Sequence, residues 1–147
     1  MMRAWYCKNL DIRYMNRLAG HIVDIETNGE LSLVSVEVTE GVVLRAIIID
    51  TPATAPYLKQ GASVNITFKE TEVVLGTSAE HQISLQNRIT GTIMHIEKGR
   101  LLSRVRIQTR AGEICSVVSS RAVAQLDFKE TMNVCAMIKL NETMLSV

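Results

Sequence analysis

The heptapeptide Asn16-Arg17-Leu18-Ala19-Gly20-His21-Ile22 recurs as Asn87-Arg88-Ile89-Thr90-Gly91-Thr92-Ile93, 71 residues further along the chain. The same register continues outward through three further pairs: Val34 and Val105, Val36 and Ile107, and Gly41 and Gly112. One residue is then lost, and at an offset of 70 residues Phe68-Lys69 corresponds to Ile138-Lys139. A repeat that covers almost the whole chain predicts two copies of one small module.

The bulk composition describes a folded, globular chain. Hydrophobic residues make up 47% of the 147 residues and charged residues 21%, a balance typical of chains that bury a core. A module of about 70 residues buries too little surface to be comfortably stable alone. We therefore expect the two modules to pack together and the chain to oligomerise further.

Charge and residue usage argue against several classes of protein. A net charge of +1 provides no broad basic field, and aromatic residues, at 4% of the chain, are too few for base-stacking platforms. The longest aliphatic run, Ala46 to Ile49, is too short to span a bilayer, and residues 1–10 lack the apolar stretch of a signal peptide. Cys7, Cys115 and Cys135 show no metal-ligand spacing. We expect a reduced, cytoplasmic protein with no nucleic-acid or membrane partner.

Short runs of β-branched residues, separated by turn residues, predict five strands in each module. In the first module they cover residues 20–26, 33–39, 42–49, 64–68 and 72–75. In the second they cover residues 91–97, 104–109, 113–119, 134–138 and 143–147. A short helix is expected between the third and fourth strands of each module. One covers residues 121–126 after an N-cap at Ser120, and the other follows Asp50-Thr51, with Pro52 at its first position.

This order of elements is that of an oligonucleotide/oligosaccharide-binding (OB) type barrel. We therefore predict a mainly β fold of two tandem five-stranded OB-like barrels, each with one short helix. The polar stretch from Thr77 to Gln82 is the linker between them. It divides the chain into a first module at residues 10–76 and a second at residues 83–147.

No constellation of catalytic residues stands out. His21, His81 and His95 have no carboxylate or cysteine at ligand spacing, and the chain lacks a phosphate-cradling glycine loop and a nucleophile elbow. We expect a protein that is not an enzyme and that holds no metal cation through direct side-chain ligands.

Short polar donors gather near one predicted helix start and at the entrance to the second barrel. Ser119-Ser120-Arg121 adjoin a helix N-terminus, which offers N–H groups and a positive dipole end to an anion. The entrance adds three donors: Ser84, Gln86 and Asn87. Lys139 ends the fourth strand, and Lys69 holds the same place in the first module. An ordinary interpretation stands beside this one: Ser120 as an N-cap, Asn87 as a turn residue and both lysines as solubilising groups.

Four segments of the second module carry a resemblance to a known family. Residues 83–93 resemble the S-A-R-N-x-L-x-G-x-I opening of molybdate-binding Mop domains, also called TOBE domains. Residues 117–122 and 136–139 resemble that family's I-T-x-x-S and L-I-K-A stretches, and residues 142–147 resemble its closing strand. Because the likeness extends to both modules, over about residues 10 to 147, the chain resembles a tandem, or di-Mop, protein.

The resemblance implies five-stranded barrels, an absence of catalysis, and molybdate or tungstate bound at interfaces between modules. The family's ligand positions fall on five residues of the second module: Ser84, Gln86, Ser119, Ala122 and Lys139. Gln86 replaces an arginine and Ala122 a serine, so that a charge and a hydroxyl are missing. Ser120 or Arg121 is expected to compensate.

In the first module Asp50 places a carboxylate where an oxyanion would approach, and Thr51 and Lys69 are the remaining donors. We expect an intracellular protein that binds molybdate or tungstate for storage, buffering or delivery. The family builds its sites between modules, which favours a homotrimer, with a dimer as the second choice. The alternative is an effector-sensing or oligomerisation module that acts with a separate transporter subunit or transcriptional regulator.

Overall fold

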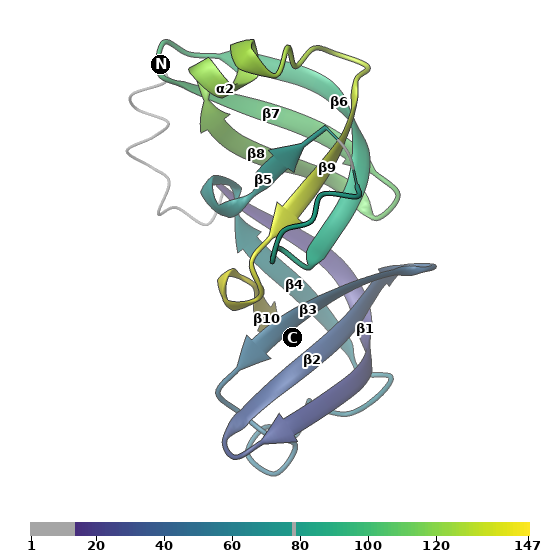
Figure 1. Ribbon diagram of the computed structural model, residues 1–147. Helices are drawn as coiled ribbons and strands as arrows, with labels where there is room; N and C mark the ends of the chain where they lie inside the picture. Colours follow the sequence, from purple (N-terminus) through teal and green to yellow (C-terminus); the bar gives the residue numbers. More distant parts are fainter. Residues whose placement is uncertain (1–13, 78) are drawn as a thin grey trace.

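The computed structural model describes residues 14–77 and 79–147. Within these ranges ten strands form two five-stranded antiparallel sheets (Figure 1), which confirms the predicted mainly β fold. The first sheet contains β1 (Met15–Asn28), β2 (Leu31–Thr39), β3 (Val42–Ile48), β4 (Ser63–Lys69) and β10 (Met144–Ser146). The second contains β5 (Val74–Gly76), β6 (Asn87–Lys98), β7 (Leu102–Thr109), β8 (Gly112–Ser119) and β9 (Asn133–Ile138). Every helix in the described part of the chain is too short or too polar to span a membrane.

The last strand of each repeat is exchanged between the two sheets. The strand orders are β10-β4-β1-β2-β3 and β5-β9-β6-β7-β8. Leu75 of β5 lies opposite Ala136 of β9, and Leu145 of β10 lies opposite Ile66 of β4. Figure 1 shows β5 within the second module and β10 within the first. The expectation that each module supplies its own fifth strand is therefore wrong, because tertiary contacts choose the partner of a three-residue strand.

The repeated apolar positions form the cores of the two modules. Val34 and its counterpart Val105 are both fully buried, as are Phe68 and its counterpart Ile138. Along the strands these side chains alternate with exposed residues, as in β4, where Val64, Ile66 and Phe68 point inward. Burial of the inward-facing apolar side chains drives each sheet to wrap around them, and the buried residues of both modules form one hydrophobic cluster.

The glycine of the repeated heptapeptide allows two strands to approach closely. A Cβ atom at Gly91 would lie 2.6 Å from the backbone oxygen of Gln108, and one at Gly20 would meet the backbone oxygen of Glu37. No side chain fits at either place, so both positions require glycine. Each glycine shortly precedes a β-bulge in its long strand, and the bulge bends that strand across the module.

One α-helix lies in the described ranges, α2 (Ser120–Gln125), at the end of β8. Its N-cap is Ser119, whose Oγ accepts a hydrogen bond from the Ala122 N–H at 3.0 Å, so the cap predicted at Ser120 is wrong by one residue. The helix predicted after Asp50 is also wrong, because residues 52–61 form turns and bends there. Local bonds compete with the helix: the Thr54 hydroxyl donates to Asp50 Oδ1, and the Thr51 N–H donates to Thr54 Oγ1.

The repeated asparagine ties each module to the third strand of the other. Asn87 Nδ2 donates to the Arg45 carbonyl at 2.7 Å, and Asn87 Oδ1 accepts from the Arg45 N–H at 2.8 Å. Asn16 makes the same two bonds, both 2.8 Å, with Cys115, the counterpart of Arg45. Both asparagines are buried. Each side-chain amide thus pairs with a backbone as a neighbouring strand would.

Two junctions between the modules follow from these contacts. The Asn87 junction comprises Asn87, Arg45 and Thr143, whose hydroxyl donates to the Arg45 carbonyl at 2.9 Å. The Asn16 junction comprises Asn16, Cys115, Glu70 and Arg104, with the last two joined by an ion pair. The two junctions occupy equivalent positions in the repeat but differ in chemistry.

Replacing Asn87 by Ala should lower the free energy of unfolding by roughly 1–3 kcal/mol, because two hydrogen bonds between modules are lost. Asn133→Ala is the control, since Asn133 is exposed and makes a single side-chain bond, to Thr92. That control should change stability by about 0.5 kcal/mol or less. Urea unfolding measures both variants. Equal, small losses would show that the asparagine does not hold the modules together.

Candidate functional site

Three of the predicted donors lie at the Asn87 junction. Asn87 pairs with Ile138, so Gln86 precedes β6 and Lys139 follows β9 at the same end of the second sheet. Ser84 lies two residues before Gln86. The side chains of Ser84, Gln86 and Lys139 are exposed, and none makes a hydrogen bond or ion pair with another described residue. The structure brings these three donors to one end of the module with their polar groups uncommitted.

Arg45 adds an exposed guanidinium to this junction. Three hydrogen bonds fix its backbone: the Arg45 N–H donates to Asn87 Oδ1, and the Arg45 carbonyl accepts from Asn87 Nδ2 and from the Thr143 hydroxyl. Sequence analysis missed Arg45, because only the packing of one module on the other places β3 beside the start of β6. One local signal was available: Arg45 is the single charged residue in the strand Val42–Ile48. Lys139 and Arg45 thus supply two cations, and the 3-10 helix η3 (Leu140–Glu142) supplies one carboxylate, Glu142.

Asn87 and Arg88 have structural partners. The Asn87 side chain is buried and both of its polar atoms are bonded to Arg45, so it positions the junction. The Arg88 guanidinium donates to four backbone carbonyls at 2.5–3.2 Å, those of Ala79, His81, Ile83 and Leu85. Arg88 therefore holds the linker against β6.

Ser119, Ser120 and Arg121 lie at the opposite end of the second sheet. Ser119 pairs with Leu102, beside the far end of β6, which contains 12 residues. At about 3.3 Å per residue the two ends of β6 are roughly 35–40 Å apart along the strand. The Ser120 hydroxyl is already bonded to the Ser103 hydroxyl at 2.8 Å and to the Gly99 carbonyl at 2.6 Å. Within one chain these residues do not meet Lys139.

The two donors of the first module are also separated. Lys69 is exposed and pairs with Met15 at the Asn16 junction. Thr51 follows β3, whose last residue Ile48 pairs with Ser32, toward the far end of β1. Asp50, next to Thr51, therefore does not stand beside Lys69 in this chain. Within a single chain, the Asp50 carboxylate is therefore not placed to repel an anion bound at Lys69.

A buried ion pair closes the Asn16 junction. Glu70, in the 3-10 helix η2 (Glu70–Glu72), accepts from Arg104 Nε at 2.8 Å and from Nη2 at 3.1 Å, and its side chain is 4% exposed. The hydrogen bond to Glu70 raises the pKa of Arg104. Burial raises the pKa of the nearby Cys115 thiol to about 11, so the thiol is protonated at neutral pH. The charges of Glu70 and Arg104 thus cancel, and the exposed cations beside this junction are Lys69 and Arg17.

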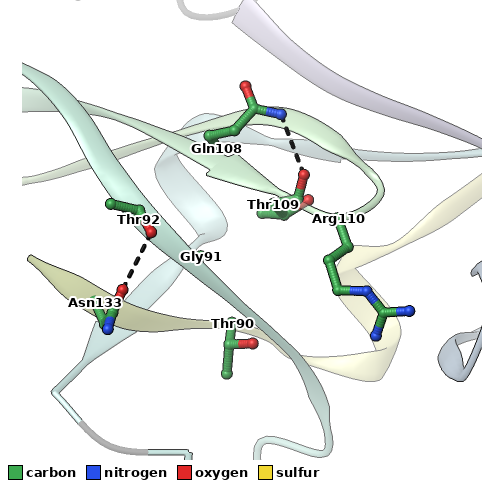
Figure 2. A pocket seen from close by; sticks show the side chains of 7 residues that line it. All are labelled: Thr90, Gly91, Thr92, Gln108, Thr109, Arg110 and Asn133. Carbon is green, nitrogen blue, oxygen red and sulfur yellow. Dashed lines mark hydrogen bonds between the residues drawn. The ribbon is translucent and has the colours of Figure 1, made fainter. Parts of the chain in front are cut away.

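Elsewhere the described residues offer no focused site. Within residues 14–77 and 79–147, no group of three or more His, Cys, Asp or Glu side chains is placed to hold a metal ion. Figure 2 shows a shallow polar depression of about 590 Å³ on the second module, lined by Thr90, Thr92, Gln108, Arg110 and Asn133 among others. None of the anion-binding residues predicted from the sequence lines this depression. Its Gln108 and Arg110 side chains point away from each other in Figure 2, so no common centre forms.

Comparisons with known proteins bear on the Asn87 junction and on the whole fold. The sequence profile of the TOBE domain matches residues 83–145. The structure is similar to a crystal structure of the cytoplasmic molybdate-binding protein ModG with molybdate bound, with a TM-score of 0.83 and 28% sequence identity. That similarity covers 90% of this chain and 95% of the other. Residues 83–145 match the TOBE domain family, and the chain as a whole shares its fold with ModG.

Two further solved structures are similar to part of this chain. MopII from Clostridium pasteurianum shares 29% identity, with a TM-score of 0.38 over 40% of this chain and 88% of that one. A molybdate-binding protein from Sporomusa ovata shares 25% identity, with a TM-score of 0.39 over the same shares of the two chains. No curated protein matches the sequence. The family resemblance inferred from the sequence is confirmed.

Breaking the ion pair of the Asn16 junction should destabilise the protein. Glu70→Leu leaves the Arg104 guanidinium partly buried without its carboxylate, and should cost about 3 kcal/mol, at the lower end for buried pairs because Arg104 is partly exposed. The double variant Glu70→Leu/Arg104→Leu copies Leu140 and Leu33, the corresponding residues of the other repeat. It should recover most of the loss. Urea unfolding of both variants would contradict this interpretation if the double variant were as unstable as the single one.

Proposed function

We propose that this protein binds molybdate or tungstate and serves as an intracellular, non-catalytic store, buffer or carrier of the oxyanion. The observation that carries the proposal is the similarity, over 90% of the chain, to ModG solved with molybdate bound. The exposed, uncommitted donors of the Asn87 junction support it independently, because a tetrahedral dianion needs several converging hydrogen-bond donors and few carboxylates.

The proposed ligand groups are Ser84, Gln86, Lys139 and Arg45. Two cations, an amide and a hydroxyl can replace part of the hydration shell of a dianion. Charge-assisted hydrogen bonds of this kind contribute on the order of 1.5–3 kcal/mol each. Arg45 supplies the positive charge that is missing at Gln86, where the family has arginine. Asn87 takes part by fixing Arg45 rather than by touching the anion.

The Asn87 junction is better suited to an anion than the Asn16 junction. At the Asn16 junction Met15 stands in place of Gln86, and the buried Cys115 stands in place of Arg45. The charge of Arg104 is neutralised there by Glu70. Lys69 and Arg17 remain exposed there, but the amide of Gln86 and the guanidinium of Arg45 have no counterpart, so we assign the stronger site to Lys139 and a weaker one, or none, to Lys69.

The remaining predicted donors require a second chain. Ser119, Ser120, Arg121 and Thr51 lie far from Lys139 within one chain, and they reach the proposed site only from a neighbouring subunit. We therefore keep the homo-oligomer, a trimer in preference to a dimer, as part of the proposal. Exposed apolar side chains on and beside the β2–β3 pair supply surface for such an interface: Leu31, Ile47 and Ile49.

The proposal includes closure of each sheet into an OB-like barrel. In the first sheet the edge strands β3 and β10 are in contact, and in the second β8 and β5 are in contact. Closure leaves no long sheet edge exposed and presents the strand ends, with their lysines, at the two junctions.

Lys139→Ala and Arg45→Ala should each weaken molybdate binding about tenfold, because each removes one charge-assisted hydrogen bond worth about 1.5 kcal/mol. Arg45→Ala keeps the backbone bonds to Asn87, so the fold is retained. Lys69→Ala, at the equivalent position of the other repeat, is the matched control and should change affinity little. Isothermal titration with molybdate, tungstate and sulfate measures the three variants. Loss of binding in Lys69→Ala with unchanged binding in Lys139→Ala would refute the assignment.

Light scattering at micromolar concentration should give a mass about three times the 16.3 kDa of the chain, since sites between subunits require a closed oligomer. The measurement is made with and without molybdate. A mass of one chain under both conditions would rule out sites built between subunits.

A further inference from the structure

Arg88 gathers backbone carbonyls of the linker around one planar cation. Its guanidinium donates at 2.5–3.2 Å to the carbonyls of every second residue before β6: Ala79, His81, Ile83 and Leu85. We call residues 79–86 the strap, because this one arginine holds their backbone. Alternate peptide units of the strap therefore share one orientation.

The direction of these carbonyls fixes the direction of the N–H groups that follow them. A trans peptide unit is planar, so its C=O and N–H point in opposite directions, and the described part of the chain contains no cis peptide bond. The N–H of Ser84 belongs to the same peptide unit as the Ile83 carbonyl, and the N–H of Gln86 to that of the Leu85 carbonyl. Both N–H groups therefore point away from the guanidinium of Arg88.

The strap presents these two N–H groups as uncommitted donors. Neither has a hydrogen-bond partner in residues 14–77 or 79–147, and Ser84 and Gln86 are both exposed. The two peptide units lie close together, because Nε and Nη2 of the same guanidinium hold their carbonyls. Neighbouring backbone N–H groups that point the same way form anion-binding surfaces in proteins. Two backbone donors thus accompany the hydroxyl of Ser84 and the amide of Gln86.

The positive charge of Arg88 strengthens this donor pair. Each peptide unit has a dipole of about 3.5 D, and a carbonyl that points at a cation turns the positive end of that dipole outward. Gln86 precedes Asn87, which pairs with Ile138, so the donor pair lies at the same end of the second sheet as Lys139. An anion at the Asn87 junction is therefore attracted by Arg88 without contacting it.

We propose that Arg88 is a positioning residue of the oxyanion site, an inference that rests on the oxyanion-binding function proposed above. By holding the strap, Arg88 directs the backbone N–H groups of Ser84 and Gln86 toward the anion and fixes the backbone that carries both side chains. The position requires arginine, because a planar fork with five donors binds several carbonyls at once, whereas the ammonium of lysine has three donors on one atom.

Isothermal titration of the full chain with molybdate tests this role. Arg88→Ala should weaken binding at least about tenfold, the equivalent of one charge-assisted hydrogen bond. Arg88→Lys should recover little of the affinity, although it restores the charge. Arg106→Ala is the control: it removes an exposed cation of the same module, one that pairs with Glu113, and should leave the affinity within about twofold. If thermal unfolding shows that Arg88→Ala is not folded, Arg88→Lys provides the comparison.

A double-mutant cycle separates positioning from a general effect of charge. In the Arg88→Ala background Gln86→Ala should cost little further affinity, because the strap no longer holds that side chain in place. Lys139→Ala should weaken binding as much in this background as in the wild type, because Lys139 lies outside the strap. A general effect of charge would leave the cost of Gln86→Ala unchanged and would overturn the positioning role.

Amide hydrogen exchange, measured residue by residue by NMR, reports on the two N–H groups directly. Molybdate should slow exchange at Ser84 and Gln86 at least about fivefold in the wild type and leave it unchanged in Arg88→Ala. Unchanged exchange at both residues in the molybdate-bound wild type overturns the inference, as does an Arg88→Ala or Arg88→Lys variant with wild-type affinity. These outcomes leave the proposed function intact. A wild-type chain that binds neither molybdate nor tungstate overturns the proposed function, and this inference with it.

Discussion

Two asparagine side chains, each bonded through both polar atoms to the backbone of the other module, hold together a fold that neither repeat completes alone. Asn16 forms hydrogen bonds with the N–H and C=O of Cys115 on β8, and Asn87 forms the same bonds with Arg45 on β3. These are the last strands of the two sheets, where unpaired backbone groups otherwise invite association with other chains. The exchange of β5 and β10 completes the opposite edges. Modules of about 70 residues, marginal alone, thereby become one unit.

The same architecture carries different chemistry at its two junctions. At the Asn16 junction the cysteine is buried and protonated, and Arg104 is neutralised by Glu70. At the Asn87 junction Leu33 and Leu140 replace the ion pair and Arg45 replaces the cysteine. The ion pair Glu70–Arg104 is thus buried at one junction, whereas at the other the charges of Arg45 and Lys139 are exposed and pair with no other described residue. One repeated pattern has thus given two junctions of different charge.

The sequence was enough to predict the repeat, the positions of the main strands and the residues of the core, because each of these depends on local periodicity and on apolar pattern. It was not enough to predict the partner of β5 or β10, since three residues hold too little information to choose between two equivalent edges. The helix expected after Asp50 failed because Thr54 bonds to Asp50 and Thr51. Among the predicted site residues, the resemblance named Ser84, Gln86 and Lys139 together, and these three lie at one end of the second sheet. Arg45 was missed because long-range packing alone places it there.

Joining the two modules in one chain explains how the junctions came to differ. Two identical modules assembled as a symmetric dimer must have identical junctions, because every substitution appears at both. A charged residue that suits an anion would then also appear where the modules need an apolar or paired contact. Within a single chain positions 45 and 115 vary independently, as do 70 and 140. Glu70 and Arg104 therefore stabilise one junction without neutralising the cations of the other, and Arg45 and Lys139 keep their exposed charges at the Asn87 junction.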